Sequence, residues 1–241
     1  SETFTLAVID GNGCVSPLSD SVEVVVNPLP AQPTVQASGP LEFCAGDSVT
    51  LSGPAGFTYA WSNGASGQSI TVDSSDTYSL TVSDGNGCAS PISAATQVTV
   101  NPLPVQPLIT ASDTTAFCAG GDVTLSAPSG FDYLWSNGET TANILVDSSG
   151  TFTVQVIDSN NCISPLSPSV AVTVNPLPAQ PTIAASDSLV FCADDSVSLS
   201  GPAGFSYLWS TGATSQSITV DTAGSFTLTV IDSNACVSPV S

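Results

Sequence analysis

The chain has 241 residues, 20 acidic side chains and no Lys, Arg or His, so its formal net charge is -20 at pH 7. Nucleic acids and anionic membrane surfaces are bound through basic side chains, and the composition therefore excludes both as partners. The missing His and Lys also remove the usual general bases and phosphate-binding groups, so we do not expect an enzyme. With 41% hydrophobic residues the chain is nevertheless expected to fold.

An internal repeat organises the sequence. The stretch NPLP begins at Asn27, Asn101 and Asn175, and Trp61, Trp135 and Trp209 recur at the same spacing of 74 residues. Three repeats are therefore expected at 27–100, 101–174 and 175–241, the last without its final strand, and residues 1–26 match the closing part of a repeat. Because the pattern begins and ends in mid-repeat, we expect a segment of a longer array. No apolar run approaches the ~20 residues of a membrane span, so direct membrane insertion is not expected.

Within each repeat, apolar residues alternate with Ser, Thr and Gln, which indicates half-buried β-strands. The expected inward-facing residues of the first repeat are Val49, Leu51, Ile70, Val72, Tyr78, Leu80 and Val82, and those of the second are Val123, Leu125, Ile144, Val146, Phe152, Val154 and Val156. Turns are expected at Gly53-Pro54, Asn63-Gly64 and 85–87. The pattern predicts an all-β protein whose sheets pack face to face, with Trp61, Trp135 and Trp209 in the core.

The order G-x-S-V-x-L, Y-x-W-S-N-G, I-x-V and G-x-F-x-V-x-V-x-D-x-N-x-C resembles the immunoglobulin-like and PKD-like repeats of giant surface adhesins and gliding-motility-associated secreted proteins of Bacteroidetes. The resemblance implies tandem immunoglobulin-like β-sandwich repeats in a linear rod. It also implies export through the type IX system and a role in attachment or gliding. The tryptophans then match the buried residue of strand C, and Tyr78, Phe152 and Phe226 match the aromatic residue of strand F. The chain departs from the pattern where Gly53 and Leu80 replace the inter-sheet cysteines.

Seven cysteines without a metal-binding spacing predict an oxidised, extracellular protein. If the topology is that of an immunoglobulin domain, Cys44 and Cys88 lie at opposite ends of a sandwich, about 20 Å apart, and cannot be bridged. We therefore favour pairing between repeats, Cys44 with Cys162 and Cys118 with Cys236, through a long loop at 158–168. In this scheme we expect the disulfide partners of Cys14, Cys88 and Cys192 in repeats beyond this sequence. The second scheme pairs Cys44 with Cys88, Cys118 with Cys162 and Cys192 with Cys236 within repeats.

The motif D-x-N precedes the cysteine of each closing loop, as in Asp84 with Asn86 and Asp158 with Asn160. The side-chain oxygens of this motif could form half of a calcium site that Asp47, Asp73 and Asp76 complete. The alternative, which we favour, is that they form simple Asx turns. We expect no other cofactor. The pairs Asp194/Asp195 and Asp73/Asp76 are interpreted as solvated turn residues rather than a glycosidase acid and base.

The resemblance implies one modification, O-glycosylation at Asp followed by Ser or Thr and a small or aliphatic residue. The candidates are Ser21, Ser48, Thr114, Ser188, Ser196 and Thr222.

The expected function is structural. The sequence predicts the stalk of a secreted cell-surface filament or giant adhesin, stiffened by the Pro-rich linkers that start with N-P-L-P and by disulfides. Its expected partners are neighbouring repeats of the same chain, or identical chains in a filament. Two alternatives stay open: a subunit of a self-assembling extracellular fibre, and a carbohydrate-binding accessory module in which Trp61, Trp135 and Trp209 stack on sugar.

Overall fold

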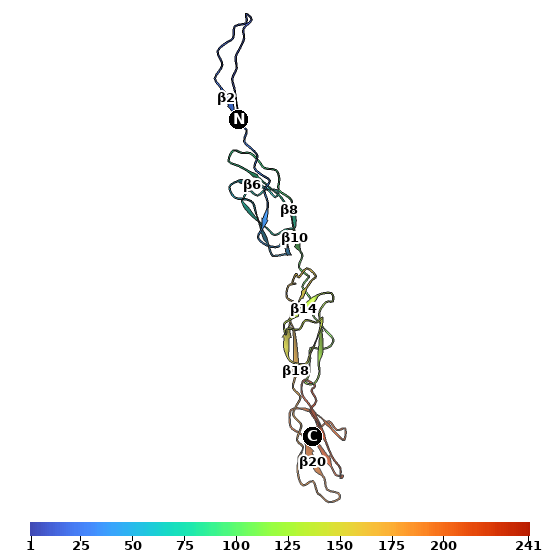
Figure 1. The fold of residues 1–241 in the computed structure, drawn as a ribbon. Coiled ribbons are helices and arrows are strands. Elements are labelled where there is room, and N and C mark those ends of the chain that lie inside the picture. Colours follow the sequence, from blue (N-terminus) through green and yellow to red (C-terminus); the bar gives the residue numbers. More distant parts are fainter. The chain divides into compact units, whose positions relative to one another are not determined.

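The computed structural model describes residues 1–241, and every regular element in it is a β-strand (Figure 1). There are two compact units, Ser1–Pro102 and Leu103–Ser241. The strands of the first unit are β1 (Glu2–Phe4), β2 (Val22–Val24), β3 (Gln36–Ala37), β4 (Glu42–Cys44), β5 (Val49–Ser52), β6 (Thr58–Trp61), β7 (Ser69–Val72), β8 (Asp76–Tyr78), β9 (Leu80–Ser83) and β10 (Thr96–Asn101). Those of the second unit are β11 (Thr110–Ala111), β12 (Ala116–Cys118), β13 (Val123–Ser126), β14 (Asp132–Trp135), β15 (Asn143–Val146), β16 (Gly150–Phe152), β17 (Val154–Ile157), β18 (Val170–Asn175), β19 (Ala184–Ala185), β20 (Val197–Ser200), β21 (Ser206–Trp209), β22 (Ser217–Val220) and β23 (Leu228–Ile231). No helix long and apolar enough to span a bilayer is present.

The second repeat shows the strand order most completely. One sheet has the antiparallel order β11-β13-β15, in register with Val123 opposite Val146 and Leu125 opposite Ile144. A second sheet has the order β12-β18-β16, in which β12 and β18 run parallel. Strand β14 pairs with β17, which follows β16 after the single residue Thr153. The first repeat has the same arrangement, with β3-β5-β7, β4-β10-β8 and β6-β9.

The alternating apolar residues form the core, as the period-two pattern predicts. Buried residues gather in three separate clusters, one in each repeat. In the second repeat Leu125 and Val154 are fully buried and Trp135 is 2% exposed. The indole Nε1–H of Trp135 donates to the carbonyl of Thr141 at 2.8 Å, so its one polar atom is satisfied inside the protein.

A close contact crosses the core of the first repeat. A Cβ placed on Gly53, at the end of β5, would lie 2.5 Å from Cδ2 of Leu80 on β9. At the corresponding positions the second repeat has Ala127 and Val154, and Ala127 packs against its core cluster. The two pairs therefore have the same number of side-chain carbons. Glycine faces leucine in the first repeat, and alanine faces valine in the second.

The segment expected as a long loop at 158–168 instead runs beside β17. Ile163 forms an antiparallel bridge with Ile157, and the N–H of Ser164 donates to the carbonyl of Val156. The N–H of Val156 in turn donates to Oγ of Ser164 at 3.0 Å rather than to a backbone carbonyl. Ser167 makes the same pair of bonds with Val154. Serine hydroxyls thus substitute for strand carbonyls in a segment that its prolines keep out of regular pairing.

A further difference concerns the residues before β5 and β13. Cys44 and Cys118 end the short strands β4 and β12, which the alternating pattern did not predict. Each of these strands pairs in parallel with the last strand of its own repeat, β10 or β18. The third repeat contains β19-β20-β22 and β21-β23, and its residues 190–192 and 224–226, which correspond to β12 and β16, are not strands.

Residues 1–26 form a hairpin. Its strands β1 and β2 pair with each other as β8 and β10 do in the first repeat. Phe4 lies opposite Val22 in the β1–β2 pair, and Ser16 and Ser19 bond Val8 and Leu6 through their hydroxyls. The hairpin has no opposing sheet of its own, and its apolar side chains are exposed.

Candidate functional site: the cysteine joint

The cysteine joint is the contact between Cys118 of the second repeat and Cys236 of the third. A disulfide links the two residues, with 5.5 Å between their Cα atoms and 118 residues between them in the chain. Cys118 ends β12, and Cys236 lies in the segment that follows β23. This bond is the pairing between repeats that the sequence analysis favoured.

The scheme within repeats is wrong. Cys118 is bonded to Cys236 and not to Cys162, while Cys88 and Cys192 are free thiols and so pair with neither Cys44 nor Cys236. The strand directions give the physical reason. Cys118 lies opposite Asn175 at the end of β18, whereas β16 and β17 run the other way from Gly150, which lies opposite Val172. At 3.3 Å a residue, the path from Gly150 to Ile157 covers about 23 Å and leads away from the end of β18 where Cys118 lies, so Cys162 lies at the opposite end of the repeat.

The other cysteines divide into two groups. Cys44 and Cys162 are each disulfide-bonded. Cys14 and Cys192 are exposed free thiols, and Cys88 is a half-buried one. That Cys44 and Cys162 are bonded to each other stays a prediction.

A tight loop presents Cys236 to its partner. Oδ1 of Asp232 accepts the N–H groups of Asn234 at 2.9 Å and of Cys236 at 2.8 Å, and the N–H of Asp232 donates to the carbonyl of Cys236. Ala235 between them has a left-handed backbone, with φ of 64°. Cys236 is fully buried. The aspartate thus fixes the cysteine on a closed loop rather than on a flexible segment.

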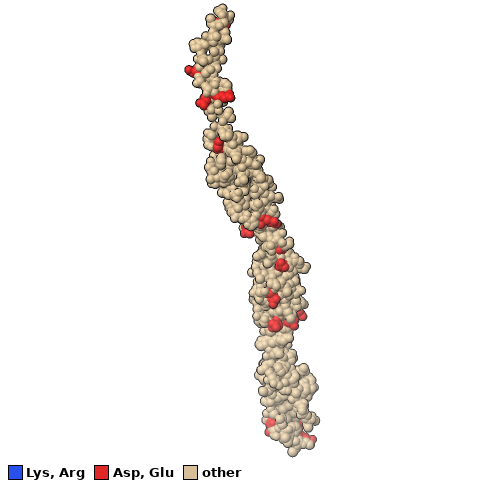
Figure 2. All heavy atoms as spheres, in the orientation of Figure 1, with Lys and Arg blue, Asp and Glu red and all other residues tan.

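The Asx turn that we favoured occurs in every copy of D-x-N. Oδ1 of Asp84 accepts from Asn86 and Cys88, and Oδ1 of Asp158 accepts from Asn160 and Cys162. No group of three or more acidic, Cys or His side chains is arranged to hold a metal ion, and a calcium site completed by Asp47, Asp73 and Asp76 stays a prediction. Carboxylates are scattered in small groups over the face shown in Figure 2.

One of these loop carboxylates has a perturbed pKa. The N–H of Cys14, and next that of Asn12, donates to Asp10 and lowers the pKa of its carboxyl group. The carboxylate form therefore stabilises the loop, because the ionised oxygen is the better acceptor.

A glutamine in each linker ties the linker to its own repeat. Nε2 of Gln32 donates to the carbonyl of Ile92 at 2.7 Å. Gln106 reaches Leu166 and Gln180 reaches Val240 in the same way. The contacted carbonyls lie in the serine-paired segment just after the cysteine loop. The Pro-rich linker is therefore held at the joint, a role that its composition alone does not reveal.

The remaining candidate residues do not join this site. Trp61, Trp135 and Trp209 are 3%, 2% and 2% exposed, so no indole face is open to stack on a sugar. Asp73, Asp194 and Asp195 are exposed and lie outside the strands, whereas Asp76, also exposed, begins β8 and does not lie in a turn. The glycosylation candidates Ser21, Ser48, Thr114, Ser188, Ser196 and Thr222 are all exposed, and their modification stays a prediction.

Comparison with protein-family models gives no match, and comparison with curated proteins gives none. Among solved structures, the human OSCAR ligand-binding domain is 14% identical, with a TM-score of 0.27 over 61% of this chain and 100% of that one. A chain from the crystal structure of a mouse coronavirus receptor-binding domain complexed with its murine receptor is 14% identical, with a TM-score of 0.36 over 59% of this chain and 100% of that one. Likenesses this weak carry no argument about function.

Proposed function

We propose that the chain is part of an extracellular structural shaft in which tandem immunoglobulin-like modules of 74 residues are locked end to end. The orders β11-β13-β15, β12-β18-β16 and β14-β17 support the immunoglobulin-like assignment. The filament is a secreted cell-surface fibre or giant adhesin of the kind that the sequence resembles. No catalytic role is proposed.

The observation that carries this proposal is the bond between Cys118 and Cys236. A covalent link between successive repeats opposes hinge motion, because the two repeats are then tethered both by the linker and by the disulfide. The linker adds to this effect. Its prolines restrict the backbone, and Gln180 ties it to the carbonyl of Val240 in the segment that carries Cys236.

The compartment follows from the same chemistry. Disulfides persist in oxidising surroundings, so the bonded cysteines support an extracellular location. The serine-paired segments support a mechanical role, since they leave no buried polar side-chain atom unsatisfied in the closing half of each repeat.

Small-angle X-ray scattering tests the shaft. We expect the oxidised chain to give a narrow distribution of maximum dimensions, and the Cys118→Ser variant to give a broader one with more bent conformers. Cys14→Ser is the matched control, because Cys14 is an exposed free thiol, and it leaves the distribution unchanged. Equal flexibility of the oxidised chain and the Cys118→Ser variant contradicts the proposal.

A further inference from the structure

The disulfide between Cys118 and Cys236 changes the covalent path along which a pulling force crosses the second unit. It joins two Cα atoms that lie 5.5 Å apart in space and 118 residues apart in the chain. A force that arrives through the linker before the second repeat therefore reaches the third repeat at Cys236 directly from Cys118. Residues 119–235 form a closed loop outside this shortest path. That loop contains every strand of the second unit except β11 and β12.

Strands β11 and β12 lie at the edges of their sheets, and both run toward the joint. Strand β12 is parallel to β18, and Cys118 lies opposite Asn175 where β18 ends. Strand β11 is antiparallel to β13, which begins five residues after Cys118, so β11 also runs toward Cys118. Further from the joint, Nε2 of Gln106 donates to the carbonyl of Leu166, in the segment that leads into β18. The chain from Gln106 to Cys118 is therefore a single pass along the repeat.

A pull across the joint acts on β12 and β18 in the same direction. Cys118 is bonded to Cys236 of the third repeat, and Asn175 leads into the linker that Gln180 ties to the same repeat. The two strands are held together by bonds such as that from the N–H of Ala119 to the carbonyl of Asn175. Because the strands are parallel and are pulled from the same end, these hydrogen bonds are not sheared. Tension therefore passes along β12 without drawing it past β18.

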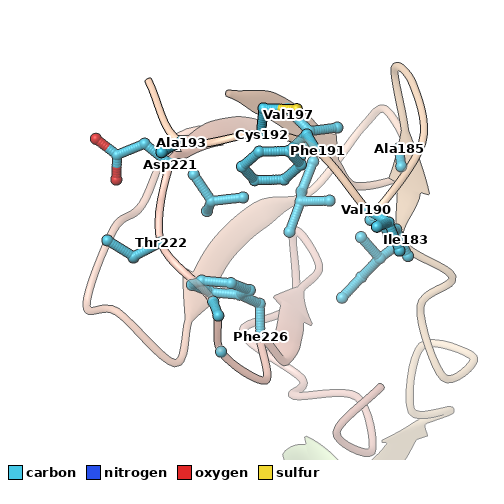
Figure 3. A pocket seen from close by; sticks show the side chains of 15 residues that line it. Ile183, Ala185, Val190, Phe191, Cys192, Ala193, Val197, Asp221, Thr222 and Phe226 are labelled. Atoms are coloured by element: carbon cyan, nitrogen blue, oxygen red, sulfur yellow. The ribbon is translucent and has the colours of Figure 1, made fainter. Parts of the chain in front are cut away.

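The equivalent segment of the third repeat lies off this path. Figure 3 shows Ile183 and Cys192 of that segment beside a pocket of about 560 Å³. Both residues belong to the closed loop 119–235, and Cys192 is a free thiol. Force enters the third repeat at Cys236 and continues into the serine-paired segment after it. Cys192 is therefore a matched control for Cys118.

We propose that the disulfide makes β11 and β12 the tension-carrying strands of the second repeat, and that the cores within 119–235 carry no tension while the bond is intact. The inference deepens the shaft function and rests on it, because only an array that is pulled along its length needs such a path. Small domains are marginally stable, so a covalent path that bypasses their cores keeps them folded under tension. The shaft then resists extension through covalent bonds rather than through the hydrogen bonds of its sheets.

Stretching of single full-length chains in optical tweezers tests the path. Azide-bearing residues replace Val105, which is 88% exposed, and Val240, which is 55% exposed, as attachment points that leave the cysteines untouched. Fully extended, the path through the disulfide between these points is about 60 Å long, whereas the path through the whole chain is about 470 Å long. We expect the oxidised chain to stay within the shorter length, and to lengthen by about 400 Å once dithiothreitol reduces the bond to two thiols.

Two variants assign this limit to the bond. Cys118→Ser is expected to remove the limit without any reductant, whereas Cys192→Ser leaves it unchanged. Lengthening of the oxidised natural chain beyond about 60 Å before reduction overturns the proposal. Loss of the limit in Cys192→Ser overturns it as well.

A change in the core tests whether the core carries tension. Ile144 on β15 is 3% exposed, and Ile144→Val weakens the core without preventing folding. With the first attachment point moved to the exposed Thr140, inside the closed loop, an unfolding step is expected in the oxidised chain, and Ile144→Val shortens the time before this step about fivefold. With the point at Val105 no unfolding step is expected in either form. A step there that Ile144→Val also hastens overturns the proposal.

Scattering without applied force measures bending at the joint separately. A chain that bends freely and still keeps the shorter limit under tension contradicts the shaft and leaves the covalent path intact. A stiff chain that lengthens by about 400 Å before reduction contradicts the covalent path alone.

Discussion

Gly53 and Leu80 provide the sharpest test of the packing between the sheets. A Cβ on Gly53 would lie 2.5 Å from Cδ2 of Leu80, and Leu80 is fully buried. Gly53→Ala must therefore displace the leucine. The second repeat tolerates Ala127 at this place because it has the shorter Val154 opposite. We expect Leu80→Val to restore the fit in the Gly53→Ala background.

The magnitudes follow from these contacts. Overpacking by one methyl group costs about 1–3 kcal/mol. Leu80→Val alone removes one buried methylene and costs about 1 kcal/mol. The double variant is expected to be close to the natural chain, because the lost methylene makes room for the added methyl and alanine loses less backbone entropy on folding than glycine. The coupling free energy between the two substitutions is therefore about 2–4 kcal/mol.

Hydrogen-exchange mass spectrometry of the full chain measures this coupling. Amides of β5 and β9 report on the first repeat, while those of β13 and β17 serve as an internal control. The reciprocal pair, Ala127→Gly with Val154→Leu, repeats the test in the second repeat. If the effects of Gly53→Ala and Leu80→Val add to within about 0.5 kcal/mol, the two residues are independent and the packing argument is refuted.

Four further predictions concern the joint and its loops. Ser164→Ala leaves the N–H of Val156 without an acceptor and costs about 1–3 kcal/mol in the exchange of that amide, whereas Ser16→Ala in the exposed hairpin costs less. Ala235→Gly removes the strain of a left-handed backbone with φ of 64° and stabilises the third repeat by about 1 kcal/mol in thermal unfolding. Gly87→Ala destabilises the first repeat for the same reason. Cys118→Ser lowers stability to urea by about 4 kcal/mol, because the bond closes a long loop, while Cys192→Ser leaves it unchanged. The pKa of Asp10 is lowered on folding, so the loop to Cys14 is stabilised above the unfolded-state pKa, and NMR shows that stabilisation lost as the pH falls through the folded-state pKa.

The alternation of apolar residues was sufficient to predict the inward faces of the longer strands. Val49 and Leu51, or Val154 and Val156, are buried where a period of two places them, because neighbouring side chains on a strand point to opposite sides of the sheet. The spacing of the cysteines was sufficient to predict the bond between Cys118 and Cys236 once the strand directions of an immunoglobulin domain were assumed.

The short strands and the polar contacts were not predictable in this way. Strand β12 has three residues, and its partner β18 lies more than 50 residues later, so no local pattern marks the pair. Ser164 and Ser167 lie in a proline-containing stretch that has the composition of a loop. Gln106 is a single amide within a linker, and only the fold brings Leu166 within its reach.

The third repeat shows how strongly such short strands depend on their neighbours. Phe43-Cys44 and Phe117-Cys118 lie in strands that pair with β10 and β18, whereas the same dipeptide at Phe191-Cys192 lies in no strand. Since the local residues are alike, the strand conformation of the dipeptide comes from its pairing with β10 or β18 and not from β-propensity.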